Sequence, residues 1–492
     1  MSNTDSNLVQ LKPGDLSSSG RHIPVPFNLC IQDAGAVHDI RFESILRLVP
    51  GRRLTGLAHW QGNRIIAKLF FQPGSWQRKC SRDKQGIQVI MEAGISTPRL
   101  IESIDSDAAE CGVLLIEYLE NGEGLRHLIE TAVDDEQCLS VLSQVVQIIA
   151  RSHDAGLWQK DIHLGNFMLQ DGRVYLLDGG DIGQSDGSLG LDTRLNNLAL
   201  FFAQLTVDMD TQIPILLDEY VTNTGVAAVN REEFLQRVVQ ARTRRLKVLE
   251  NKLFRSTTAH CCLKTRTRFL VYDRAIHSAA VERFVRNPDE FIDEDSVIKP
   301  GNSSTVSRIE LDETSYVLKR YNIKNKWHGI KRLFRPSRAH HSWRNAAVLE
   351  MLGISTSHPY LLMEERILGV MRRRAFFLGE QIAGPTLAEL IEADNGDEVM
   401  HALAQLQQYL TTFATYLISH GDMKASNFIF SDGCLYVLDL DSMKRHQQPA
   451  TFARAYLKDL MRLQKNFLGT RYEDAVERMI VNLKTHKPGI SQ

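Results

Sequence analysis

The chain has 492 residues, of which 43% are hydrophobic and 24% charged, and its formal net charge is −1. This composition is typical of a globular protein and excludes wholesale disorder, collagen-like repeats and a long coiled coil. The balanced charge excludes a histone-like polycation, and the length corresponds to two large domains or roughly three average ones.

The cysteines and the first residues indicate the compartment. There are 7 cysteines, no Cys-x-x-Cys pair occurs, and the adjacent Cys261 and Cys262 suit neither a zinc site nor a disulfide framework. No apolar run reaches the roughly 18 residues of a membrane-spanning helix. Residues 1–7 lack the basic and apolar regions of a signal peptide. We therefore expect a reducing, cytoplasmic location.

The first half of the chain predicts a flexible tail followed by alternating strands and helices. Residues 1–34 start with a polar, Ser/Gly-rich stretch and are expected to form the tail. The apolar pattern then predicts strand Arg64–Phe71, helix Asp83–Ala93, strand Gly112–Tyr118 and helix Cys138–Ala155. A polar loop and an apolar strand ending in Asp178 complete the series.

The second half predicts the same series again. The elements are strand Ser315–Tyr321, helix Ser342–Leu352, strand Ala375–Glu380 and helix Met400–Ser419, before a polar loop and a strand ending in Asp439. Four short motifs recur in the same order at offsets of 251 to 261 residues. They are Ile66–Leu69 and Val317–Arg320, Gly94–Thr97 and Gly353–Thr356, Asp161-x4-Asn166 and Asp422-x4-Asn427, and Val174–Asp178 and Leu435–Asp439.

The repeat predicts two homologous α+β domains, which we place at residues 35–285 and 290–485. The junction is expected near Arg286–Glu290, a polar segment that contains proline. About 50 residues follow Asp439, whereas more than 100 follow Asp178 within the first domain. The second domain is therefore expected to have a shortened helical part.

Each copy contains the residue types that phosphoryl transfer requires. The reaction needs a cation on the nucleotide phosphates, oxygen ligands for Mg²⁺, and a carboxylate that orients the acceptor hydroxyl and receives its proton. A lysine within an apolar strand is costly unless it is paired, so a phosphate partner is a reasonable explanation for it. The candidate cations are Lys68 and Lys319, and the candidate carboxylates for the acceptor hydroxyl are Asp161 and Asp422. The candidate Mg²⁺ ligands are Asn166, Asp178, Asn427 and Asp439.

A simpler interpretation exists for each group. The lysines could extend along a strand edge into solvent, and the Asp and Asn residues could form loop turns through their own side chains. The shared order of the three groups in both copies favours the chemical interpretation.

The order of these motifs resembles that of protein kinases, in which an Asp-x4-Asn catalytic loop precedes a strand ending in a metal-binding Asp. Four phrases resemble more narrowly the bacterial lipopolysaccharide core kinases, the Kdo/heptose kinase group. They are Leu48–Leu54, Ala67–Phe70, Lys160–Asn166 and Lys319–Asn322. The resemblance implies two tandem kinase-like domains, each with a small β-rich N-lobe and a mainly helical C-lobe. It also implies ATP and Mg²⁺ as cofactors and a heptose or Kdo hydroxyl as acceptor.

The sequence departs from the kinase pattern at several positions. There is no Gly-x-Gly-x-x-Gly loop and no recognisable activation segment, which favours a small-molecule or glycan acceptor over a protein. Alignment on the Gly-Ile-Ser-Thr motif places Asp83 where kinases have a helix Glu that pairs with the lysine, but it places Ser342 there in the second copy. Lys424 follows Asp422 by two residues, as in Ser/Thr kinases, and is expected to neutralise the transferring phosphate.

Two basic stretches suggest the kind of partner. Residues 45–82 contain eight Lys/Arg and no acid, and residues 319–344 contain nine and no acid. They could be solvated faces, or they could attract an anionic acceptor such as core glycolipid or the inner face of the inner membrane. Nucleic acid is not expected, because no zinc finger, helix-turn-helix or aromatic RNA-binding motif accompanies them.

Two other functions stay open at this point. The chain could phosphorylate another small molecule or a protein. Alternatively, both copies could be pseudokinases that act as a scaffold or regulator in envelope assembly, an idea supported by the missing glycine loop and by Ser342.

Overall fold

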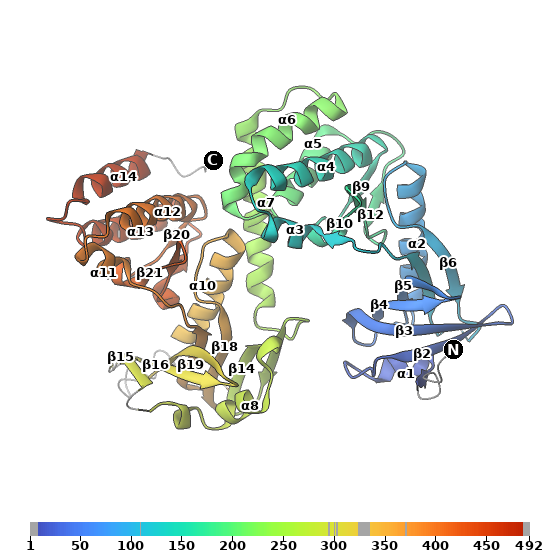
Figure 1. The fold of residues 1–492 in the computed structure, drawn as a ribbon, viewed down its shortest axis with the longest axis horizontal. Helices are drawn as coiled ribbons and strands as arrows, with labels where there is room; N and C mark the ends of the chain where they lie inside the picture. The colour runs from blue at the N-terminus through green and yellow to red at the C-terminus, as the bar shows by residue number, and fades with distance from the viewer. Residues whose placement is uncertain are drawn as a thin grey trace. The chain divides into compact units, whose positions relative to one another are not determined.

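The computed structural model divides the chain into two units (Figure 1). Unit 1 comprises residues 1–205 and 210–238, and unit 2 comprises residues 206–209 and 239–492. The structure describes residues 8–108, 110–293, 296–299, 301, 304–322, 335–369 and 371–485. Most of the second basic stretch, residues 323–334, therefore lies outside the described residues.

The N-lobe of unit 1 is a sheet in the order β1-β2-β3-β4-β5-β7-β6. Its neighbours run antiparallel except for the parallel pair β1 and β2. The strands are β1 (Val9–Leu11), β2 (Phe27–Asp33), β3 (Ala36–Val49), β4 (Arg53–Trp60), β5 (Asn63–Phe70), β6 (Leu100–Asp105) and β7 (Gly112–Glu117). Helices α1 (Pro13–Ser18) and α2 (Trp76–Glu92) accompany the sheet.

Side chains alternate between the two faces of β5, as in any strand. Ile65, Ala67 and Leu69 are buried in the apolar core of the sheet. Phe70 belongs to the other face, which packs against Trp76 and Ile87 of α2. Lys68 therefore lies on the face that α2 covers.

The N-terminal segment differs from the flexible tail expected for residues 1–34. β1 and β2 are paired within the sheet, and Leu16, Phe27, Leu29 and Ile31 are buried in its core. The polar composition of the first residues concealed this short apolar strand pattern.

The C-lobe of unit 1 is mainly helical (Figure 1). Its helices are α3 (Leu125–Thr131), α4 (Asp135–Asp154), α5 (Leu191–Phe202) and α6 (Ile213–Thr224), and its short strands are β8 (Glu123–Gly124), β9 (Leu157–Gln159), β10 (Phe167–Gln170), β11 (Arg173–Leu176) and β12 (Ile182–Gln184). Asp134 caps α4 by accepting a hydrogen bond from the Gln137 N–H at 2.8 Å. The predicted helix at residues 138–155 is confirmed as α4.

His153, at the end of α4, is completely buried among three helices. Its ring nitrogens lie 2.7 Å from the Tyr220 hydroxyl and 3.1 Å from Asn197 Oδ1. Burial lowers the pKa of His153 to about 4. The unfolded chain, with a His pKa of about 6.5, takes up a proton over the range in which folded His153 does not.

We therefore expect unit 1 to lose stability as the pH falls from about 6.5 to about 4. The sign follows from linkage, because the unfolded state binds more protons in this range, and the loss is on the order of 3 kcal/mol. Denaturant unfolding of the wild type and of His153→Gln at pH 4.5 and 7.5 measures it. The variant is expected to show a shallower pH dependence, and parallel curves would contradict the assignment to His153.

The N-lobe of unit 2 is a sheet in the order β13-β14-β18-β19-β17-β16-β15. Its strands are β13 (His260–Lys264), β14 (Arg268–Asp273), β15 (Val297–Lys299), β16 (Ser304–Leu311), β17 (Thr314–Tyr321), β18 (Pro359–Ile367) and β19 (Met371–Glu380). Its helices are α8 (Ala279–Arg286) and α10 (Arg338–Leu352). Phe284 of α8 is fully buried in the sheet core.

The predicted junction near residues 286–290 differs from the structure. β13 pairs with β14, β14 pairs with β18, and the division between the units falls within α7 (Arg231–Lys252). The expected shortening of the second C-lobe followed from this misplaced boundary. Residues 179–205 and 210–238 complete unit 1 after Asp178, and the described residues 440–485 complete unit 2 after Asp439.

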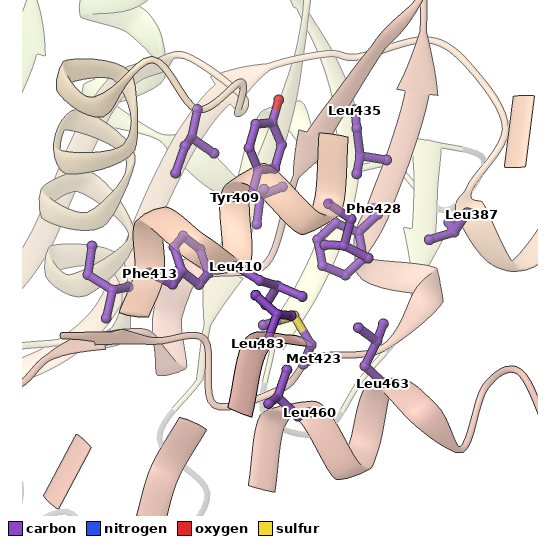
Figure 2. Packing of buried hydrophobic residues seen from close by; sticks show 14 of the residues in the cluster. Leu387, Tyr409, Leu410, Phe413, Met423, Phe428, Leu435, Leu460, Leu463 and Leu483 are labelled. Carbon is purple, nitrogen blue, oxygen red and sulfur yellow. The ribbon is translucent and has the colours of Figure 1, made fainter. Parts of the chain in front are cut away.

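The C-lobe of unit 2 is built around a large apolar cluster. Its elements are α11 (Leu387–Glu392), α12 (Gly396–Thr415), α13 (Pro449–Gln464), α14 (Glu473–Thr485), β20 (Ile418–Ser419), β21 (Phe428–Ser431), β22 (Cys434–Val437) and β23 (Lys444–Arg445). Figure 2 shows Leu410 of α12, Leu460 of α13 and Leu483 of α14 close to Met423. Burying Met423 contributes about 1.5–3 kcal/mol and fixes the loop that carries Asp422.

The repeated Gly-Ile-Ser-Thr motif has the same structural role in both units. Gly94 (φ +68°) and Gly353 (φ +78°) follow α2 and α10 in the left-handed conformation that glycine adopts without steric cost. Thr97 and Thr356 then donate from Oγ1 to a carbonyl of β11 and of β22, at 2.7 and 2.6 Å. The motif ends the helix and ties the N-lobe to the strand that precedes Asp178 or Asp439.

Candidate functional site

Three charged side chains meet in unit 1, on β5, on α2 and just after β11. Lys68 Nζ lies 3.3 Å from Asp83 Oδ1 and 3.5 Å from Asp178 Oδ1. The side chain of Asp83 is 1% exposed, that of Lys68 13% and that of Asp178 28%. The structure thus brings together the predicted cation, the predicted helix acid and one predicted metal ligand.

The charges in this cluster support one another. Burial by itself lowers the pKa of Lys68, but Asp83 and Asp178 outweigh that effect and raise the pKa overall. Burial acts to raise the pKa of Asp178, yet Lys68 and the Gly180 N–H, 3.1 Å from Asp178 Oδ1, lower it. Lys68 therefore stays a cation and Asp178 an anion at neutral pH.

The Asp-x4-Asn loop of unit 1 leaves its aspartate open to solvent. Asp161 is exposed, and among the described residues its carboxylate has no hydrogen-bond or ion-pair partner. Asn166 is buried, and its Oδ1 accepts a hydrogen bond from the His163 N–H at 2.9 Å. Gln159 braces the loop because its side chain donates to the Asp178 carbonyl at 3.2 Å.

Unit 2 retains the lysine but has a different helix contact. Lys319 Nζ lies 3.2 Å from Asp439 Oδ1, and this neighbour lowers the pKa of Asp439 against the opposing effect of burial. Ser342 of α10 hydrogen-bonds to the Tyr321 hydroxyl at 3.2 Å. Within the described ranges, no acid of α10 contacts Lys319.

The Asp-x4-Asn loop of unit 2 encloses its aspartate in cations. Lys424 Nζ lies 3.0 Å from Asp422 Oδ2, and Arg462 of α13 lies 2.5 Å from Asp422 Oδ1. Asn427 donates to the Asp422 carbonyl oxygen at 2.7 Å. Two cations, Lys424 and Arg462, therefore neutralise the carboxylate that would receive the proton.

A cavity in unit 2 lies beside Lys319 and Asp439, where the sequence resemblance predicts the nucleotide. It has a volume of about 90 Å³ and lies between the lysine strand, the end of β19 and the segment 438–440 that follows β22. Its lining includes Lys319, Ser342, Phe377, Glu380 and Asp439. Pockets for drug-sized ligands are typically about 300–1,000 Å³, so this cavity is too small for a whole nucleotide in the conformation described.

Several site residues were not found by sequence reasoning. Arg462 pairs with Asp422, and Arg338 pairs with Asp441 at 2.5 Å. Asp459 of α13 accepts hydrogen bonds from the backbone N–H groups of His420 and Gly421, at 2.7 and 3.0 Å. These contacts join residues 38 to 103 positions apart, and no motif marks them.

The oxygen ligands in unit 1 fit a nucleotide-bound Mg²⁺. Magnesium usually takes one or two protein carboxylates together with substrate phosphates and waters. Asp178 supplies a carboxylate, and the Asn166 oxygen keeps a second lone pair beyond its bond to His163. Among the described residues, no group of three or more His, Cys, Asp or Glu side chains gathers as a metal site, and none of the described helices has the length and apolarity to span a membrane.

Comparison with known proteins supports the fold. No family model matches the chain. The chain is similar to the KEOPS complex subunit Bud32 of Pyrococcus abyssi (strain GE5 / Orsay), with 29% identity over 122 residues, which are 24% of this chain and 52% of that protein. The match thus spans about half the length of this kinase-like relative. Together with the α+β architecture, it establishes a protein-kinase-like fold.

Proposed function

We propose that the protein is an ATP- and Mg²⁺-dependent phosphotransferase and that unit 1 performs the reaction. The observation that carries this proposal is the contact of Lys68 with Asp83 and Asp178 at 3.3 and 3.5 Å, beside a loop that leaves Asp161 accessible. Phosphoryl transfer depends mainly on positioning and charge neutralisation, and these groups are suited to both tasks.

Each residue of unit 1 has a distinct role in this proposal. Lys68 holds the nucleotide phosphates, and Asp83 keeps it charged and oriented. Asp178 and Asn166 hold the Mg²⁺ ion. Asp161 orients the acceptor hydroxyl and accepts its proton.

In the same proposal, unit 2 is not catalytic. Both carboxylate oxygens of Asp422 are engaged, by Lys424 at 3.0 Å and by Arg462 at 2.5 Å, so Asp422 is less open to an acceptor hydroxyl than Asp161. Ser342 cannot form an ion pair with Lys319. These features favour a regulatory or scaffolding role for unit 2, and a scaffold made of both units is the second candidate function.

The acceptor that we propose is a heptose or Kdo hydroxyl of lipopolysaccharide core, at the cytoplasmic face of the inner membrane. The sequence resemblance to the core kinases supports it. A cluster of basic side chains near the site, Arg52, Arg53, Arg78, Lys79 and Arg82, also supports it. Burial and the positive charges of the four arginines lower the pKa of Lys79, which shows how close together these cations lie. Such a cluster attracts phosphorylated sugars and acidic lipids.

Transfer of labelled γ-phosphate from ATP to purified core glycolipid tests this function. We expect Mg²⁺-dependent labelling of the glycolipid by the wild type, with a free core sugar and an unrelated protein as comparison acceptors. Labelling of the protein alone would contradict the glycan acceptor. If ATP binds to neither unit in folded protein, the phosphotransferase proposal is wrong and the scaffold is favoured.

A further inference from the structure

We propose that Gly86 and Gly179 are positioning residues, whose backbone contact sets α2 at the depth at which the short side chain of Asp83 reaches Lys68. The inference rests on the proposed function of unit 1. It assigns a role to two glycines that carry no chemistry of their own.

The contact between Gly86 of α2 and Gly179 is made by main chain alone. A Cβ atom added to Gly86 would lie 1.8 Å from the Gly179 carbonyl oxygen. A Cβ atom added to Gly179 would lie 2.5 Å from the Asp83 carbonyl oxygen and 2.6 Å from the Ile87 nitrogen. Neither position accepts any side chain unless the helix moves outward.

The length of the acid explains why the helix must lie so close. An aspartate is one methylene shorter than a glutamate, which is about 1.5 Å of reach. Asp83 nevertheless lies 3.3 Å from Lys68 Nζ. Glycine within a helix is less favourable than alanine, so Gly86 in the interior of α2 calls for a reason, and the close approach supplies one.

Unit 2 provides an internal comparison, because it differs at all three positions. Ser342, Asn345 and Leu440 occupy the places of Asp83, Gly86 and Gly179 in the repeat. Asn345 is buried, and its side chain donates to the carbonyl oxygens of Leu440 and Met443, at 2.7 and 2.9 Å. A side chain thus stands between helix and loop in unit 2, and the acid is absent there too. The unit in which helix and loop backbones approach closely is thus also the unit that carries the short acid, Asp83.

A set of three variants separates this coupling from a general packing defect. Gly86→Ala moves α2 outward, so Asp83 loses Lys68. Asp83→Glu puts a longer side chain into an unmoved helix. In the double variant the longer acid spans the wider gap. The first readout is the affinity for Mg·ATP, and the second is the rate at which an amine-reactive reagent modifies Lys68.

Each single variant is expected to weaken Mg·ATP binding on the order of tenfold and to speed the modification of Lys68. The double variant is expected to recover most of the affinity and most of the slow modification rate, because the effects of contacting residues are not additive. Gly14→Ala is the matched control, because its Cβ meets nothing within 4 Å, and it is expected to match the wild type. A double variant as impaired as the product of the two single variants overturns the inference, as does a normal Gly86→Ala.

Two further outcomes keep this test decisive. If Gly86→Ala does not fold, Asp83→Glu decides alone, and wild-type behaviour in both readouts overturns the inference. If the wild type binds no Mg·ATP, the proposed function fails. Modification of Lys68 then still decides whether the two glycines position α2.

Discussion

Replacing Asp161 by Asn is expected to lower phosphate transfer by about 10²–10⁴-fold, the usual contribution of a positioned general base. Asn has nearly the same shape as Asp, but its amide cannot take up the proton of the acceptor hydroxyl. Asp161 is exposed and has no side-chain partner among the described residues, so the variant is expected to fold normally and to keep its affinity for Mg·ATP. The measurement is initial-rate transfer of labelled γ-phosphate to core glycolipid, with unfolding curves recorded alongside.

Asp422→Asn is the matched control, since it makes the same change at the same place in the repeat. It is expected to leave transfer unchanged, because Asp422 is already neutralised by Lys424 and Arg462. The reverse result, in which Asp422→Asn abolishes transfer and Asp161→Asn does not, would assign the reaction to unit 2.

Replacing Lys68 by Met is expected to destabilise unit 1 by about 3–5 kcal/mol, because it leaves a buried carboxylate without its cation. The side chain of Asp83 is 1% exposed, and that of Asp178, the second partner of Lys68, is 28% exposed. The pKa of Asp83 is already raised by burial, and loss of Lys68 raises it further. The carboxylate then binds a proton more readily in the folded state, so the destabilisation is greatest at neutral pH and decreases as the pH falls.

Lys319→Met is the corresponding control in unit 2. Its partner Asp439 is 36% exposed and α10 presents a serine, so we expect a smaller loss, about 1 kcal/mol or less. Denaturant unfolding at pH 5 and pH 7.5 measures both variants. Equal losses for the two lysines, or a loss for Lys68→Met that grows toward low pH, would contradict this account of the ion pairs.

The sequence was sufficient to predict the elements that carry the repeated motifs. The expected strands at residues 64–71 and 315–321 are confirmed as β5 and β17, and the expected helix at residues 342–352 as part of α10. These elements have strong periodicity, and the motifs fix their order. Helix α2 begins at Trp76, earlier than the predicted Asp83, because its first turns have no regular apolar pattern.

The domain boundary could not be predicted, because the two sheets are extended at opposite edges. β1 and β2 extend the first sheet beyond β3, whose place β15 takes in the second sheet, whereas β13 and β14 extend the second sheet beyond β18. These added strands have no counterpart in the other copy. The repeat therefore gave no information about where they belong.

The candidate site was predictable as a set of residue types but not as two different sites. Asp161, Asn166 and Asp178 have the same spacing as their counterparts in the second copy, and Lys68 precedes them in the same order as Lys319 does there. The difference comes from distant residues that no motif marks. Arg462 comes 40 positions after Asp422, and Gly86 comes 93 positions before Gly179. Such contacts depend on how the helices pack, and no local sequence pattern predicts which distant residues will meet.

Calorimetric titration of the full chain with Mg·ATP tests the central claim most directly. The wild type, Asp178→Asn and Asp439→Asn are titrated at the same concentration, each variant removing the corresponding metal ligand of one unit. We predict Mg²⁺-dependent binding with one site per chain, lost in Asp178→Asn and kept in Asp439→Asn. Binding that is lost in Asp439→Asn and kept in Asp178→Asn, or no binding by folded wild type, would contradict the assignment of the nucleotide site to unit 1.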